Sequence, residues 1–382
     1  MQVVGEPVGG IRKHVHSIIN GIDTALFSQS YAYSGTVQDA RFLQEIGALR
    51  IQLHGELPLH IRKKPHFSDL VNLWKLVRYV KKNKVDILHG HGAKGGLYAR
   101  LVAKFCGIKA VYTPHGGMVH NMFSKWEDKL YVAVEKWLAK KTDFFLFESK
   151  YTADNFQSKV VKLPLHRWMV NYNGIAEVNL DAVALRSRSV GYESNAADIF
   201  NIGVFGVLRV QKGQIFAIRA MPHLLISEDK RVVLHLFGDG PDRDELQNFV
   251  NGLGIVENVK FHGDVNDPEV HMFAMDVILI PSLFESFGYV AIEAMALQKL
   301  VITNKVGGLL EVIDEQTGIL IEPENEMEVV NAIRSCLLRR NWIVQLASQG
   351  KAKVGNVFSL HNMIRNLENI YLRQKNNLGK AL

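Results

Sequence analysis

Short runs of β-branched and aromatic residues alternate along the chain with longer stretches in which apolar residues recur at helical spacing. This alternation predicts parallel sheets with helices on both faces. The strands predicted in the first half are Gln2–Val4, Ala25–Ser28, Arg50–Leu53, Ile87–His89, Ala110–Thr113 and Phe144–Phe147. The helices predicted there are Ile11–Ile19, Leu70–Lys82, Gly95–Phe105 and Lys125–Lys140.

The second half repeats the same alternation. Its predicted strands are Ile199–Phe205, Val232–Phe237, Val259–Phe261, Val277–Ile280 and Leu300–Thr303. The helices between them are expected to start near Gly213, Asp242, Glu269 and Gly288. The pattern therefore predicts two doubly wound α/β units in tandem, with ligands at the carboxyl ends of the strands.

A chain of 382 residues is too long for one hydrophobic core and suits two domains. The stretch between Asn173-Gly174 and Ile199 is loop-like, and Asn-Gly favours a turn. The predicted division is an N-terminal domain over 1–175, a linker over 176–198, a C-terminal domain over 199–358, and a helix over 359–382 that packs back toward the N-terminal domain.

Charge is distributed unevenly along the chain. Up to Trp168 there are 25 Lys and Arg against 13 Asp and Glu, a net charge of +12, whereas the remainder carries −5. A basic half suggests an anionic surface as partner, either nucleic acid or lipid. No nucleic-acid-binding module is recognisable. No apolar run reaches the roughly 18 residues of a membrane span.

The sequence predicts a cytoplasmic protein. Cys106 and Cys336 lie far apart in apolar, helix-like settings, which is typical of reduced cysteines. Met1 is followed almost at once by polar residues, so no signal-peptide pattern is present, and the first strand looks short.

Glu285 and Glu293 lie eight positions apart across the start of an apolar helix. Helical side chains lean toward the N-terminus, so Glu293 is expected to point back toward the loop of Glu285. The helix start, with Gly288 allowing close approach, suits a phosphate. Two carboxylates that can accept hydrogen bonds from sugar hydroxyls, next to a phosphate site, indicate a nucleotide-sugar site. The alternative is one acid that complements the helix dipole and one that reaches solvent.

Two loops after predicted strands could hold phosphate. Gly9-Gly10 opens the first helix, and a merely structural turn is the alternative there. Arg209 and Lys212 precede a helix of the second half, where two cations could clamp a diphosphate or form a solvated turn. The glycine turn at Gly238 lacks the spacing of a dinucleotide site.

Histidines cluster in two segments of the first half. His89 ends one predicted strand and His91 follows it, and either structural or functional roles suit them. Thr113-Pro114-His115-Gly116-Gly117 ends the next strand and is expected to present an imidazole to a sugar. No cysteine or acid completes a ligand set, so no metal site is predicted. Asp242-Arg243-Asp244 has the DxD pattern of metal-dependent sugar transfer, but acids are common in a first helical turn.

Together these residues resemble the retaining nucleotide-sugar glycosyltransferases of family 4, in particular those of bacterial surface polysaccharides. The resemblance runs from about Val3 to Tyr371 and implies the GT-B fold, in which two Rossmann-like domains face each other across a cleft. The motifs that carry it are Gly9-Gly10, Asp86–His91, Thr113–Gly116, Asn173–Ile175, Arg209 with Lys212-Gly213, Gly238–Pro241, and Glu285 with Glu293.

The resemblance implies roles for individual residues. Arg209 and Lys212 would stabilise the departing diphosphate, Glu285 would bind the donor sugar, and His115 would lie beside the anomeric carbon. The nucleobase would rest near Val259–Gly263, read mainly by the backbone. The residues implied in donor binding are Gly9, Gly10, Gly238, Phe261, Ser286, Phe287, Gly288 and Glu293.

The resemblance also implies transfer of a hexose or N-acetylhexosamine, with retention of configuration, to a glycan or a polyprenyl-diphosphate-linked acceptor. Neither a metal nor a cofactor is required, and the nucleotide sugar is a substrate. The alternatives are a nucleotide-sugar epimerase of the same architecture, a soluble glucan or sucrose-type synthase, and a non-catalytic sugar-binding protein.

Two amphipathic segments suggest a peripheral site on the cytoplasmic membrane. The first has Phe67, Leu70, Leu73, Trp74 and Val77 opposite Lys75, Arg78, Lys81 and Lys82. Ordinary packing on the sheet explains this segment as well. The second, which we favour because it adjoins the expected acceptor site, has Met118, Met122, Phe123 and Trp126 beside Lys125 and Lys129.

Overall fold

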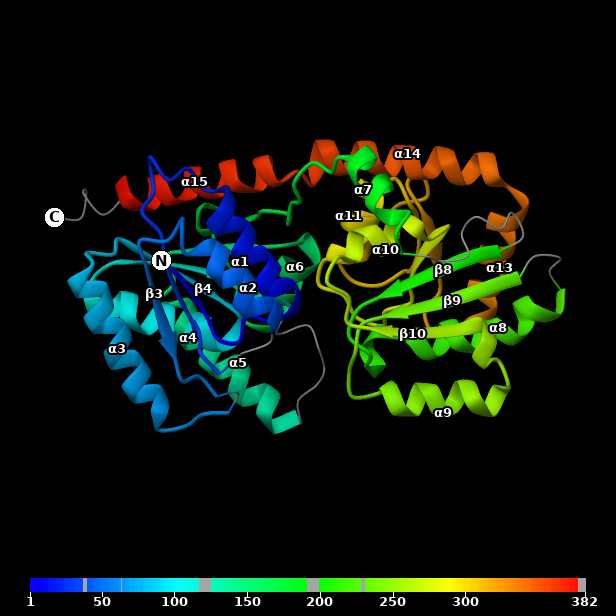
Figure 1. Ribbon diagram of the computed structural model, residues 1–382. Coiled ribbons are helices and arrows are strands. Elements are labelled where there is room, and N and C mark those ends of the chain that lie inside the picture. Colours follow the sequence, from blue (N-terminus) through cyan, green and yellow to red (C-terminus); the bar gives the residue numbers. More distant parts are fainter. Residues whose placement is uncertain (37–39, 63, 117–124, 191–198, 228–230, 377–382) are drawn as a thin grey trace. The chain divides into compact units, whose positions relative to one another are not determined.

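The computed structural model describes residues 1–36, 40–62, 64–116, 125–190, 199–227 and 231–376 (Figure 1). The chain forms two compact units. Unit 1 comprises Met1–Gly174 with Leu360–Leu382, and unit 2 comprises Ile175–Ser359.

Unit 1 is built on a seven-stranded parallel sheet in the order β3-β2-β1-β4-β5-β6-β7. The strands are β1 (Gln2–Val4), β2 (Ser30–Ser34), β3 (Gly55–Leu59), β4 (Ile87–His91), β5 (Lys109–Thr113), β6 (Phe144–Phe147) and β7 (Trp168–Val170). The helices are α1 (Gly9–Gly21), α2 (Ala40–Leu49), α3 (Ser68–Lys82), α4 (Gly92–Cys106), α5 (Lys125–Ala139), α6 (Lys150–Lys159), α15 (Leu360–Asn376) and the short η1 (Leu165–Arg167).

Both faces of this sheet are covered by helices. Apolar residues of α1, α2 and α15 form clusters on one face, and residues of α3, α4, α5 and α6 form clusters on the other. Helix α4 packs very closely, because a Cβ at Gly95 would lie 2.4 Å from the Val3 carbonyl oxygen and one at Gly96 would lie 2.2 Å from the Tyr112 ring. Burial on both faces explains the continuous apolar run of β6, Phe144–Phe147.

Two predicted strands of the first half are wrong. Residues Ala25–Ser28 form a turn instead, in which the backbone amide of Phe27 donates to the Asp23 carbonyl at 2.9 Å. The strand follows at β2, whose five residues are all buried. The other wrongly predicted strand is Arg50–Leu53, in which Ile51 is 90% exposed. The strand begins later in the chain, at β3. Strand β3 includes Pro58, which an edge position tolerates.

Unit 2 has a six-stranded parallel sheet in the order β10-β9-β8-β11-β12-β13. The strands are β8 (Ile199–Phe205), β9 (Arg231–Phe237), β10 (Val259–Gly263), β11 (Val277–Ile280), β12 (Leu300–Asn304) and β13 (Ile319–Ile321). The α-helices are α7 (Leu180–Ser187), α8 (Gln214–Ser227), α9 (Arg243–Leu253), α10 (Pro268–Ala274), α11 (Tyr289–Ala296), α12 (Leu309–Val312), α13 (Glu326–Leu338) and α14 (Arg340–Val357). Two 3-10 turns, η2 (Val210–Lys212) and η3 (Val256–Asn258), precede α8 and β10.

Helices α8, α9 and α13 cover one face of this sheet, and α10 and α11 cover the other (Figure 1). The segment expected to be a linker, 176–198, contains α7, which packs against α10 within unit 2. The described linker residues therefore belong to unit 2, because their apolar side chains find a partner there. Val183 of α7 is buried.

Candidate active site

Each sheet has one place where neighbouring strands send their connections in opposite directions. In unit 1 it lies between β1 and β4, and in unit 2 it lies between β8 and β11. Loops that diverge at this point leave a crevice at the carboxyl ends of the strands, and open parallel sheets bind their ligands there. Several predicted site residues follow these strands: Gly9 and Gly10 come after β1, Arg209 and Lys212 after β8, and Glu285 after β11.

In unit 2, the loop after β8 docks on the loop after β11. The backbone amide of Leu283 donates to the Gln211 carbonyl at 2.8 Å. Gly213 has a φ of +67°, and a Cβ there would lie 2.0 Å from the Pro281 carbonyl oxygen. A side chain at Gly213 would therefore push apart the two loops that border the switch point.

An ion pair joins these two loops. Lys212 Nζ donates to Glu285 Oε1, which also accepts from Ser282 Oγ at 3.3 Å. The side chain of Arg209 is exposed in the same loop as Lys212 and has no hydrogen-bond or ion-pair partner among the described residues. The loop thus carries Lys212 in an ion pair and Arg209 as a cation available to a ligand.

The loop after β11 leads into α11 through Gly288, whose φ is +101°. Phe287 is buried and packs edge-on against Phe358, with ring centroids 5.6 Å apart. The amide of Gly308 donates to the Glu285 carbonyl at 3.0 Å. These contacts hold the backbone of the loop in place. Ser286 lies within it, half-buried.

Glu293 lies in the second turn of α11 and is half-buried. Its neighbours Ile292 and Ala294 are completely buried. The helix places Glu293 one to two turns beyond Gly288, as the sequence pattern predicts.

Gly238 and Phe261 have clear structural roles. Gly238 has a φ of +119°, and a Cβ there would lie 2.2 Å from the Gly206 carbonyl oxygen, so this glycine lets the loops after β8 and β9 touch. The Phe261 side chain packs against the core of unit 2, which leaves only its backbone for a ligand. On the other side of the strand, His262 stacks on Phe237 with centroids 4.4 Å apart.

In unit 1, Gly9 and Gly10 form the exposed start of α1, directly after β1. Gly9 has a φ of +53°, and nothing lies within 4 Å of a Cβ built on it. The position is consistent with the predicted contact to a ligand, because the first amides of a helix have no partner within the helix.

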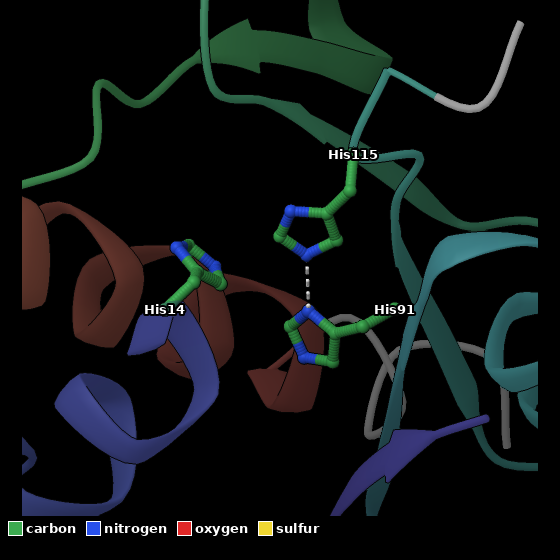
Figure 2. Close-up of side chains that lie close together, drawn as sticks. All are labelled: His14, His91 and His115. Carbon is green, nitrogen blue, oxygen red and sulfur yellow. Dashed lines mark hydrogen bonds between the residues drawn. The ribbon is translucent and has the colours of Figure 1, made fainter. Parts of the chain in front are cut away.

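Three imidazoles from different elements meet at the carboxyl edge of this sheet (Figure 2). His14 lies in α1, His91 ends β4, and His115 follows β5 with a φ of +53°. His91 Nδ1 lies 3.1 Å from His115 Nε2. His14 was not among the predicted site residues, and its place in the helix that follows the Gly9-Gly10 turn was the available signal in the sequence.

Burial keeps these imidazoles neutral. Desolvation lowers the pKa of His14 to about 4, although its hydrogen bond with Asn173 works in the opposite direction. Desolvation, followed by repulsion from neighbouring imidazoles, holds the pKa of His91 and of His115 well below the usual range.

His89 has an interior role. Its Nδ1 lies 2.7 Å from the Tyr371 hydroxyl and its Nε2 lies 2.8 Å from Thr113 Oγ1. Both ring nitrogens are therefore occupied by partners within unit 1.

The predicted membrane residues lie on or before α5. Trp126 is 67% exposed, and Lys129 is exposed beside it. Met118, Met122, Phe123 and the side chain of Lys125 lie outside the described residues. None of the helices in the described part of the chain is long and apolar enough to cross a bilayer. In the other predicted stripe, Phe67, Leu70 and Trp74 are exposed, whereas Leu73 and Val77 pack against the core.

Two family models match the chain. The family described as "Glycosyltransferase Family 4" matches residues 8–177, and "Glycosyl transferases group 1" matches residues 199–339. A Klebsiella pneumoniae protein described as an uncharacterized 41.2 kDa protein in the cps region is 30% identical over 292 residues, which cover 72% of this chain and 76% of the relative.

An Escherichia coli enzyme named UDP-Gal:alpha-D-GlcNAc-diphosphoundecaprenol alpha-1,3-galactosyltransferase is 23% identical over 330 residues, covering 83% of this chain and 82% of its own. The crystal structure of Anabaena HepE in complex with UDP-glucose aligns with a TM-score of 0.81 at 20% identity, over 98% of this chain and 100% of that one. The prediction of two Rossmann-like domains is confirmed. The chain belongs to glycosyltransferase family 4 and has the GT-B fold.

Proposed function

We propose that the protein is a retaining glycosyltransferase that moves a hexose or N-acetylhexosamine from a nucleoside-diphosphate sugar to a glycan or a polyprenyl-diphosphate-linked acceptor in cell-surface polysaccharide synthesis. The ion pair between Lys212 and Glu285 at the switch point carries the proposal. On this proposal Lys212 is a cation for the donor diphosphate, and Glu285, which it contacts, is an acid for the donor sugar. The names of the relatives support this substrate class.

Donor binding would break the ion pair between Lys212 and Glu285 and give each residue a new partner. The diphosphate takes Lys212 and Arg209 as counter-charges, and Glu285 is released to accept hydrogen bonds from sugar hydroxyls. Glu293 would accept from the ribose. Backbone amides of Ser286, Phe287 and Gly288 would donate to the sugar and phosphate, with Gly238 and the backbone of Phe261 nearby. The contributions of Gly9, Gly10 and His115 remain predictions.

The proposed reaction needs no protein nucleophile. The bond from the anomeric carbon to the phosphate oxygen breaks, and its electron pair stays on the diphosphate, which Arg209 and Lys212 stabilise. The acceptor hydroxyl attacks the oxocarbenium-like centre on the face that the phosphate leaves. Its proton passes to the departing phosphate oxygen. Configuration is retained, and neither a metal nor a cofactor takes part.

Helix α5 is the proposed contact with an anionic membrane. Trp126, Leu130, Val134 and Trp137, spaced at i, i+4, i+8 and i+11, are all exposed and share one face. Lys129, Lys136 and Lys140 are exposed alongside, and Lys141 Nζ lies 3.8 Å from the centre of a Trp137 ring. An exposed apolar stripe flanked by lysines suits the surface of the cytoplasmic leaflet.

The test uses purified protein with a panel of nucleoside-diphosphate hexoses and N-acetylhexosamines, with and without acceptors. We expect a product only with acceptor, with the anomeric configuration of the donor by NMR, and no loss of rate when chelator is added. A sugar isomer formed without acceptor would instead indicate an epimerase. Transfer to water-soluble acceptors without membrane binding would indicate a glucan or sucrose-type synthase.

A further inference from the structure

The three-histidine cluster of unit 1 has the geometry of a cation site. One ring nitrogen from each of His14, His91 and His115 lies within 4.8 Å of the other two. Ring centroids are 4.9 Å apart for His14 and His115, and 5.3 Å apart for His91 and His115. Figure 2 shows the three rings gathered around one point, with His115 coming from the opposite side to His14 and His91.

Hydrogen-bond partners outside the cluster determine which ring nitrogen of His91 and of His14 has the free lone pair. The Gln2 amide donates to the Tyr371 hydroxyl at 3.1 Å, and its Oε1 lies 2.9 Å from His91 Nε2. An amide oxygen only accepts, so His91 Nε2 carries the hydrogen and Nδ1 presents its lone pair toward His115. By the same logic, Asn173 Oδ1, at 2.6 Å from His14 Nδ1, leaves the lone pair of His14 on Nε2.

This arrangement matches the requirements of zinc-type ions. Imidazoles bind such metals in the neutral form, with the other N–H held by an outer acceptor, as Gln2 holds that of His91 and Asn173 that of His14. Nitrogens bound about 2.1 Å from a tetrahedral zinc ion lie about 3.4 Å apart, and Nδ1 of His91 lies 3.1 Å from Nε2 of His115. His115 is half-buried, which leaves a solvent side for a fourth ligand. Glu148 lines a small cavity together with His14 and supplies an acidic side chain nearby.

We propose that His14, His91 and His115 bind a divalent transition-metal cation such as Zn²⁺, and that the bound ion inhibits sugar transfer. Binding needs the ring hydrogen of His115 to move from Nε2 to Nδ1, together with an inward shift of the His14 imidazole, because the three ligand nitrogens span up to 4.8 Å. Imidazole ligands favour zinc, copper, nickel or cobalt over magnesium and calcium. The inhibition rests on the proposed function, because the ion would occupy the imidazole of His115.

Cobalt(II) is the probe, because a three-histidine tetrahedral site gives it visible absorption. Equilibrium dialysis and spectroscopy are expected to show one Co²⁺ per chain, displaced by Zn²⁺. His115→Asn, which keeps a residue tolerant of positive φ, and His14→Asn should each weaken binding by more than about tenfold. Asn173→Ala should weaken it by about tenfold to a hundredfold, since outer partners orient ligands.

His16→Asn is the matched control, because His16 is also buried in α1 but pairs with Glu45 at 3.0 Å. It should bind Co²⁺ as the wild type does. No stoichiometric binding by the wild type, or equal binding by His115→Asn and the wild type, would overturn the site. Binding with an unchanged transfer rate would overturn the inhibition. A failure of the proposed function would show separately, as no transfer in chelator-treated protein.

Discussion

Arg209 is the exposed cation beside the ion pair of Lys212 and Glu285. Because charge develops on the departing diphosphate, Arg209→Ala is expected to raise the barrier by about 2 to 4 kcal/mol, by analogy with lost oxyanion donors. That corresponds to a fall in kcat of about thirtyfold to a thousandfold. The measurement is turnover with donor and acceptor both saturating.

Arg340→Ala is the control, since Arg340 is an exposed arginine at the start of α14 in the same unit. It should leave kcat unchanged. Near-normal turnover of Arg209→Ala would show that the assigned role is wrong.

Arg100 and Glu135 form a buried pair that the sequence analysis did not identify. Both hydrogen bonds measure 2.8 Å, and the side chains are 0% and 3% exposed. Removing one partner leaves an uncompensated buried charge, so Glu135→Ala should lower the free energy of unfolding by about 3 to 5 kcal/mol. Urea unfolding followed by tryptophan fluorescence reports mainly on unit 1, which contains Trp74, Trp126, Trp137 and Trp168.

The exposed pair of Arg50 and Glu56, in the same unit, provides the comparison. Arg50→Ala should lower the free energy of unfolding much less than Glu135→Ala does, because solvent screens exposed pairs. Equal losses from the two variants would contradict the assigned role of burial.

At the scale of elements, the buried pair of Arg100 and Glu135 sets how α5 is turned. Glu135 faces inward, so Trp126 and Trp137 face outward. The double variant Trp126→Ser/Trp137→Ser is expected to lose most of its flotation with anionic liposomes, because apolar burial and lysine attraction act together. Its transfer to a water-soluble acceptor analogue should be retained.

Ile51→Ser is the control for this surface, since Ile51 is an isolated residue of unit 1 that is 90% exposed. It should float as the wild type does. If the wild type floats equally with neutral and anionic liposomes, or not at all, the proposed membrane contact is wrong.

At the scale of the whole molecule, unit 2 should lose stability in mild acid. Burial, followed by the charges of His262 and Lys260, lowers the pKa of His235 from 6.5 to about 4. Between these values the unfolded chain binds a proton that the folded unit does not. The stability that neutral His235 contributes to unit 2 is therefore complete above pH 6.5. As the pH falls from 6.5 toward about 4, the free energy of unfolding decreases by about 1.4 kcal/mol per pH unit for this one proton.

His235→Gln should flatten this dependence, because Gln does not titrate. Urea unfolding midpoints by circular dichroism between pH 7 and pH 4.5 provide the measurement, with His16→Asn as a control in unit 1. Parallel pH profiles for His235→Gln and the wild type would count against the prediction.

The second half shows how far local sequence determines structure. The predicted strands Ile199–Phe205 and Val277–Ile280 agree with β8 and β11 at both ends, because dense β-branched and aromatic runs suit strands buried on both faces. The same rule misplaced β2. The segment Ala25–Ser28 is an apolar run, but it forms a turn in which the Phe27 amide donates to the Asp23 carbonyl.

Sequence alone determined that two parallel α/β units follow one another, and it identified Arg209, Lys212 and Glu285 as candidates for chemistry. Their types and their places after strands are local properties. Only the tertiary structure decided that Lys212 meets Glu285 and that His14 joins His91 and His115. Those meetings depend on strand order, because residues dozens of positions apart become neighbours only when their strands lie side by side in one sheet.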